Sequence, residues 1–107
     1  KDTVKLVKGS KIEKGDIFEA AKITALNAVK NTPNILPYCH PIKVTSVKVS
    51  FKLGENFIKV IVTVKAFERT GVEMEALTGV SNALLCIWDM VKKYEKDKSG
   101  NYPNTLI

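Results

Sequence analysis

The longest stretch of the sequence that can form one unbroken helix runs from Val72 to Glu95, and it constrains the fold more than any other feature. It contains no proline, and Gly79 is its only internal glycine. Thr70 and Glu73 have the spacing of a capping box, in which a hydroxyl and a carboxylate satisfy free backbone N–H groups. We therefore expect a helix of about six turns. Because it is apolar on several sides, it requires a broad surface on which to pack.

Two alternating runs that precede this helix can supply that surface. Between residues 44 and 53 apolar side chains alternate with serines and lysines, which is the period of a strand with one buried face. Residues 54–56 make a turn, and a second alternating run covers residues 57–67. The two runs predict an antiparallel hairpin whose apolar face the long helix covers. We also expect residues 105–107 to begin a final strand.

A shorter helix is predicted from Ile17 to about Asn31. Asp16 can cap it, with Glu19 at the capping-box spacing, and Pro33 ends it. Residues 1–15 are basic and weakly periodic, so we expect an N-terminal arm. These elements predict an α+β fold with two helices packed on one face of an antiparallel sheet. The fold is a ferredoxin-like sandwich if a strand precedes the first helix.

The composition favours one domain over residues 1–107. A chain of 107 residues, 45% of them hydrophobic, is long enough for a single core. It has no signal-peptide pattern and no apolar run that would cross a bilayer, so we expect a cytoplasmic protein with no membrane partner. Cys39 and Cys86 are too few for a disulfide scaffold, which favours a reducing compartment. The net charge of +6 fits either an anionic partner or good solubility.

The single histidine, His40, follows Cys39 in a loop that Pro37 and Pro41 stiffen. A zinc site needs three or four protein ligands, so we expect no metal here. A nucleophilic Cys–His pair is also disfavoured, because adjacent side chains in an extended loop point to opposite sides. From these residues alone, a surface histidine held by its own loop is the simplest interpretation.

The acids of the long helix fall into two groups. Glu75 and Asp89 return to nearly the same face, about 21 Å apart along the axis. One small reaction centre cannot touch both from a single chain, so a shared site needs a long ligand or a second subunit. Asp89 and Lys92 lie one turn apart, which fits a surface ion pair or an acid and base beside an anionic substrate. Glu73 is open to two interpretations, a helix cap and a ligand contact.

Four short blocks are distinctive in their order and spacing. They are Lys14-Gly15-Asp16, Pro37-Tyr38-Cys39-His40-Pro41, Thr70-Gly71-Val72-Glu73-Met74-Glu75-Ala76-Leu77-Thr78 and Asp89-Met90-Val91-Lys92. Together they resemble the molybdenum-cofactor biosynthesis protein C family, the cyclic pyranopterin monophosphate synthases, over residues 11–93. Tyr38, Trp88 and Val91 stand where leucine, tyrosine and cysteine are common in the family. The family also has a longer N-terminal region and a tail rich in glycine and lysine, so we expect both termini to be truncated or disordered relative to it.

The resemblance implies a pyrophosphate-eliminating lyase of molybdenum-cofactor synthesis. Its substrate would be a nucleotide-derived triphosphate, 3',8-cyclo-7,8-dihydroguanosine 5'-triphosphate, and its product cyclic pyranopterin monophosphate, formed without metal or organic cofactor. The resemblance assigns catalysis to Asp89, Lys92 and Lys14. It places substrate-binding residues in two blocks: Tyr38, Cys39, His40, Met74 and Glu75, with Glu73 as a further candidate. It also implies a hexamer, a trimer of dimers with the site at the dimer interface.

Two other classes of protein compete with this interpretation. A small basic nucleic-acid-binding α+β module would use Phe51, Phe57 and Phe67 as stacking platforms. However, Phe51 belongs to the face that we expect to be buried, and no Lys/Arg-Gly-Phe strand motif is present. A non-catalytic assembly subunit would tolerate loss of Asp89 and Lys92, yet both residues are in place.

Overall fold

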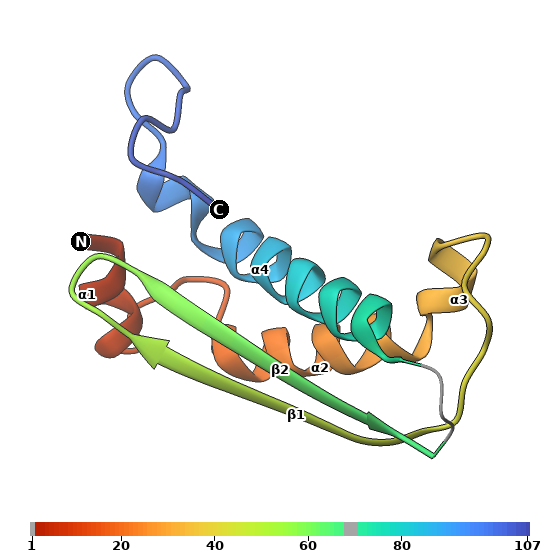
Figure 1. Cartoon of the computed structure of the whole chain (residues 1–107). Helices are drawn as coiled ribbons and strands as arrows, with labels where there is room; N and C mark the ends of the chain where they lie inside the picture. Colours follow the sequence, from red (N-terminus) through yellow and green to blue (C-terminus); the bar gives the residue numbers. More distant parts are fainter. Residues whose placement is uncertain (1, 68–70) are drawn as a thin grey trace.

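A computed structural model describes residues 2–67 and 71–107 (Figure 1). In chain order the elements are α1 (Asp2–Lys8), α2 (Ile17–Lys30), α3 (Thr32–Ile35), β1 (Val44–Leu53), β2 (Ile58–Ala66) and α4 (Glu73–Glu95). The two strands pair antiparallel, and α2 and α4 pack together against the hairpin. The structure confirms the predicted α+β class and is consistent with a ferredoxin-like fold. Within the described ranges, no helix has both the length and the apolar character needed to cross a membrane.

The hairpin keeps the alternation that its sequence predicts. Phe51 lies opposite Val60, and Val49 lies opposite Val62. These four side chains are partly buried against the core formed by the helices. The lysines of both strands lie at the intervening positions and are exposed, so the second face of the hairpin is the solvated one.

Small residues let α2 and α4 approach closely. Ala21 and Ala25 of α2 and Ala83 of α4 are fully buried. At Gly79, a Cβ atom would lie only 2.7 Å from Cγ2 of Val29, which is closer than side-chain carbons normally come. The absence of a side chain at Gly79 therefore sets the spacing of the helix pair, and with it the direction of α4.

The beginnings of the two long helices differ from each other. Asp16 caps α2 as predicted, since its Oδ1 accepts hydrogen bonds from the backbone N–H groups of Phe18 at 3.0 Å and Glu19 at 3.2 Å. For α4, the predicted cap Thr70 lies outside the described residues. The helix begins at Glu73, and Val72 at the N-cap position makes no side-chain capping bond. Pro33, predicted to end the first helix, lies instead in the first turn of α3.

The N-terminal residues, which we expected to form a basic arm, include the helix α1. Thr3, Val4 and Val7 are buried, because this short helix packs against α4. The carboxylate of Glu95 holds this arrangement together. Its Oε2 accepts from Thr3 Oγ1 at 2.5 Å, and its Oε1 accepts from Thr105 Oγ1 at 3.1 Å.

The end of the chain corrects a second expectation. Residues 105–107 form no strand in the described structure. The chain turns after α4 instead, where Oδ1 of Asp97 accepts from the backbone N–H groups of Ser99 and Asn101. Leu106 is exposed, so the apolar pair at the end of the sequence packs against no sheet in this structure.

We expect Glu95→Ala to lower the free energy of unfolding by about 1–3 kcal/mol, because two hydrogen bonds to one carboxylate are lost. Urea denaturation followed by circular dichroism measures the change. Glu19→Ala is the matched control, because the side chain of Glu19 makes no polar contact with the described residues except an exposed ion pair with Lys22. If both variants were equally stable, Glu95 would not fasten α1 and the C-terminal segment to α4.

Candidate active site

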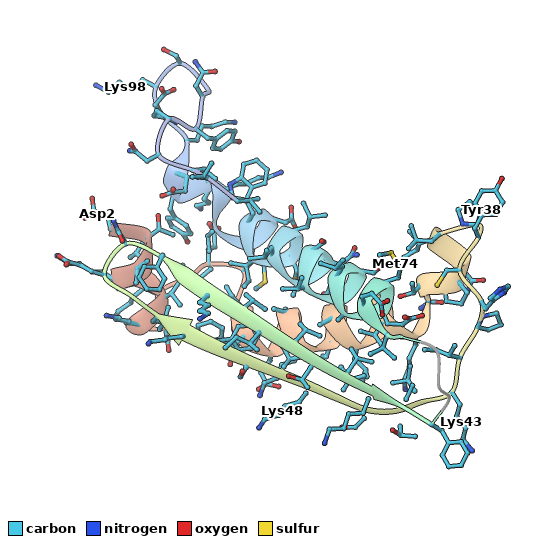
Figure 2. The ribbon with its side chains drawn as sticks, viewed as in Figure 1. Asp2, Tyr38, Lys43, Lys48, Met74 and Lys98 are labelled. Carbon is cyan, nitrogen blue, oxygen red and sulfur yellow. The ribbon has the colours of Figure 1, made fainter. Side chains whose placement is uncertain are left out.

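A cavity of about 450 Å³ opens at the N-terminal end of α4. The loop that follows α3 forms its other wall, and Figure 2 shows Tyr38 and Met74 at this end of the molecule. All six residues that the sequence predicts for substrate binding line it: Tyr38, Cys39, His40, Glu73, Met74 and Glu75. The structure therefore brings together two blocks that are more than thirty residues apart in the sequence.

The loop is held in place from its start. Thr32 is fully buried at the beginning of α3, and its Oγ1 donates to the carbonyl of Ala28 at 2.9 Å. The backbone N–H of Cys39 donates to the carbonyl of Leu36 at 3.1 Å. Pro37 further restricts the backbone between them. The position of Cys39 against α4 therefore follows from local hydrogen bonds and from proline chemistry.

Glu75 and Cys39 form the polar contact of the cavity. Glu75 is only 3% exposed, and Cys39 Sγ donates to its Oε2 at 3.5 Å. Burial raises the pKa of the Cys39 thiol above its ordinary value, and the hydrogen bond to Glu75 and its negative charge raise this pKa further. A thiol with a raised pKa is a poor nucleophile at neutral pH. Cys39 is thus suited to donate a hydrogen bond rather than to attack a substrate.

The second group of predicted residues lies farther along α4. Nζ of Lys14 donates to the backbone carbonyl of Asp89 at 3.1 Å and lies 3.8 Å from its Oδ1. Nζ of Lys92 lies 3.7 Å from the same Oδ1 and 5.7 Å from the centre of the Trp88 ring. These side chains are 43–65% exposed. The group, which we call the Asp89 cluster, presents two ammonium groups and one carboxylate to solvent.

The comparisons with known proteins agree with the four sequence blocks. The model of the MoaC family matches residues 1–102. The chain belongs to the MoaC family. It is 56% identical over 106 residues to a protein of Pyrococcus horikoshii named "Probable cyclic pyranopterin monophosphate synthase", a match that covers 99% of this chain and 67% of that protein.

Relatives from two other organisms carry the same name. A protein of Sulfurisphaera tokodaii is 53% identical over 107 residues, covering 100% of this chain and 71% of the relative. A protein of Methanosarcina mazei is 50% identical over 106 residues, covering 99% of this chain and 68% of the relative. This MoaC-family chain therefore spans about two thirds of the length of the curated relatives that it matches.

The cavity and the Asp89 cluster do not form one site within a single copy of this MoaC-family chain. Glu75 and Asp89 are separated by fourteen residues of α4, or about 21 Å along its axis. None of Lys14, Asp89 and Lys92 lines the cavity. The nine predicted residues are thus divided between the two ends of one helix.

Some features of the two groups were not apparent from the sequence. Leu36 and Ile42 give the cavity apolar walls on either side of the proline-bracketed loop. In the sequence, only the hydrophobicity of these two residues beside the loop indicated that they could line a cavity. Trp88 lies under the Lys92 ammonium, which only the helical spacing of four residues suggests. Among the described residues, no group of three or more His, Cys, Asp or Glu side chains could hold a metal ion.

The packing of Phe51 argues against a nucleic-acid platform on the hairpin. Its ring lies 4.7 Å from that of Phe18, on the face covered by helices. Phe57 and Phe67 are exposed, but they lie beyond the ends of β2. The hairpin therefore lacks the row of exposed aromatic side chains on which single-stranded bases stack.

The raised pKa of Cys39 predicts slow alkylation at neutral pH. Iodoacetamide reacts with the thiolate, so we expect the rate at Cys39 to rise at higher pH than that of a cysteine in an unstructured peptide. Glu75→Gln removes the negative charge and should shift the pH midpoint of this rise downward. Mass spectrometry separates Cys39 from Cys86. An unchanged midpoint in the variant would mean that Glu75 does not act on the thiol.

Proposed function

We propose that this chain is a cyclic pyranopterin monophosphate synthase, a lyase of cytoplasmic molybdenum-cofactor biosynthesis. Its substrate is 3',8-cyclo-7,8-dihydroguanosine 5'-triphosphate, and its products are cyclic pyranopterin monophosphate and pyrophosphate. The observation that supports the proposal most is that two of the four sequence blocks line one cavity, while residues of the other two form the Asp89 cluster. The names of the relatives at 50–56% identity support the same reaction.

The cavity is suited to the purine-derived ring of this substrate. Glu75 is buried and accepts a hydrogen bond from a thiol, which is a weak donor. Its carboxylate thus keeps acceptor capacity for the amino and ring N–H groups of a guanine-type edge. Tyr38 and Met74 offer apolar surface beside it. In this assignment Glu73, which lines the same cavity, is a ligand contact.

The Asp89 cluster is suited to the triphosphate and to proton transfer. Lys14 and Lys92 can hold phosphate oxygens and stabilise the charge that builds on the departing pyrophosphate. Opening the purine-derived ring and closing the pyran ring both move protons. Asp89 accepts a proton in one step, and a neighbouring lysine donates one in another.

The complete site is built from two copies of the chain, and the exposed surface of α4 supports this assignment. Met74, Leu77 and Leu85 are large apolar side chains with 44–56% of their surface exposed. Leu77 and Leu85 are equally distant in sequence from Ser81, as are Met74 and Trp88. A two-fold axis near Ser81 would therefore pair two antiparallel α4 helices through these side chains.

The charges along α4 favour the same arrangement. Its first turn carries Glu73 and Glu75, and its last turns carry Lys92 and Lys93. Antiparallel pairing brings the acidic end of one helix to the basic end of the other. It also brings the cavity of one copy towards the Asp89 cluster of its partner, so both could contact one triphosphate substrate. Three such dimers would form the hexamer that the family resemblance implies.

The direct test of the reaction is incubation with the cyclised guanosine triphosphate. We expect release of pyrophosphate above the level of a heat-killed control, together with formation of the cyclic phosphate product. No release above that control from the protein with both of its termini would contradict the assignment as an enzyme.

A further inference from the structure

Glu13, which lies outside all four sequence blocks, connects the loop that carries Lys14 to the end of α4. The backbone N–H of Glu13 donates to the hydroxyl oxygen of Tyr94 at 2.8 Å. The carboxylate of Glu13 also pairs with Nζ of Lys93. That ammonium lies 5.5 Å from the centre of the Tyr94 ring. Two adjacent residues of α4 thus hold one residue of the loop, across eighty positions of sequence.

The hydrogen bond to Tyr94 lies directly before Lys14 in the loop, where the backbone conformation determines the position of the Lys14 side chain. Ile12 is buried in the core on one side, and Asp16 is fixed as the cap of α2 on the other. Between them Gly15 has a φ of 113°, in the left-handed region that glycine tolerates. The bond from Glu13 to Tyr94 therefore fixes the backbone directly before Lys14. The Lys14 ammonium then reaches the Asp89 carbonyl at 3.1 Å.

The contacts of Glu13 contribute little to the free energy of unfolding, but they can determine the position of the Lys14 ammonium. The side chains of Lys93 and Glu13 are 57% and 67% exposed, and exposed ion pairs contribute little to the free energy of unfolding. The Glu13 N–H is also exposed, so water can replace the Tyr94 hydroxyl if it is removed. A displacement of a reacting group by about 1 Å, by contrast, can slow a reaction by about 100-fold.

We propose that Tyr94 is a positioning residue for the reaction. Its hydroxyl holds the loop through Glu13 so that the Lys14 ammonium stays against Asp89. The inference rests on the proposed function, because it gives Lys14 a role in turnover. Tyr94 itself contacts the loop and not the substrate, and Lys93 supports the same residue from the side.

The first test compares Tyr94→Phe with Tyr102→Phe. Both remove one phenolic hydroxyl at the same end of the molecule, and Tyr102 packs edge-on against Trp88 through its ring, which phenylalanine keeps. We expect Tyr94→Phe to lower kcat about 10-fold with KM within about 2-fold, at an unchanged melting temperature. Glu13→Gln should have a smaller effect, because it keeps the backbone N–H. If kcat of Tyr94→Phe equals that of Tyr102→Phe, the proposal is wrong.

The second test reads the position of Lys14 without any substrate. Acetylation of lysines by an N-hydroxysuccinimide ester is followed by mass spectrometry, with Lys48 on the open face of the hairpin as internal reference. We expect Lys14 to react several-fold faster in Tyr94→Phe than in wild type, because its ammonium is released from Asp89. A lower kcat with unchanged Lys14 reactivity would overturn a role through Lys14. If the wild type releases no pyrophosphate, the proposed function fails, while the acetylation rates still decide whether this connection between the loop and α4 exists.

Discussion

Replacing Lys92 with methionine is expected to lower kcat for the cyclised triphosphate by about 100-fold to 10,000-fold. The Lys92 ammonium lies 3.7 Å from the Asp89 carboxylate, so the variant removes one half of the proposed acid–base pair. Methionine keeps an unbranched apolar stem of similar length beside Trp88, so the helix surface should change little. Steady-state pyrophosphate release gives kcat and KM, and thermal melting shows whether the fold is kept.

The control for this variant is Lys48→Met, which makes the same change on the exposed face of the hairpin. It lowers the net charge equally and should leave kcat unchanged. Loss of general electrostatic attraction would raise KM in both variants, whereas loss of acid–base chemistry lowers kcat only in Lys92→Met. Full turnover by Lys92→Met, with weaker binding alone, would contradict the acid–base role.

The elements that could be predicted from sequence are those with strong local signals. The hairpin follows from the alternation of apolar and polar residues along most of both strands, and α2 follows from the Asp16 cap. The length of α4 follows from the absence of proline between Glu73 and Glu95. These features depend on neighbours within a few residues, so no knowledge of the tertiary structure is needed.

The features that were missed depend on contacts between distant residues. The helix α1 is short, and its Val4 and Val7 become informative only once α4 is present to bury them. In the same way, the bond between Glu13 and Tyr94 joins residues that no local pattern connects.

The sequence predicted which residues belong to the candidate site. It did not predict which of them line the cavity and which form the Asp89 cluster. The sequence blocks named the residues, and helix geometry placed Glu75 and Asp89 about 21 Å apart. That Lys14 joins Asp89, rather than the cavity, depends on how the loop before α2 packs on α4. This assignment decides which pairs of variants can complement each other.

Mixing two inactive variants, one altered in the cavity and one in the Asp89 cluster, is expected to restore activity. In a mixed dimer of Glu75→Gln and Asp89→Asn chains, one site carries both changes and the other carries neither. With equal amounts and free exchange, about half of the dimers are mixed and each has one intact site, so about a quarter of wild-type activity should return.

A second mixture serves as the control. Lys14 and Asp89 lie in the same cluster of one chain, with Nζ of Lys14 3.8 Å from Oδ1 of Asp89. In a mixed dimer of Lys14→Ala and Asp89→Asn chains, each site therefore carries one damaged residue. This mixture should recover no activity, although it undergoes the same exchange of subunits.

Pyrophosphate release by the Glu75→Gln and Asp89→Asn mixture is the most direct test of a site shared by two copies. One variant is labelled with 15N, because Glu75→Gln and Asp89→Asn change the mass of the chain equally. After exchange of subunits, native mass spectrometry verifies that mixed dimers have formed, and the rate is compared with that of each variant alone. A site built from two chains predicts recovery of about a quarter of wild-type activity in this mixture and none in the control. A rate no higher than the average of the separate variants, with mixed dimers present, would contradict the shared site.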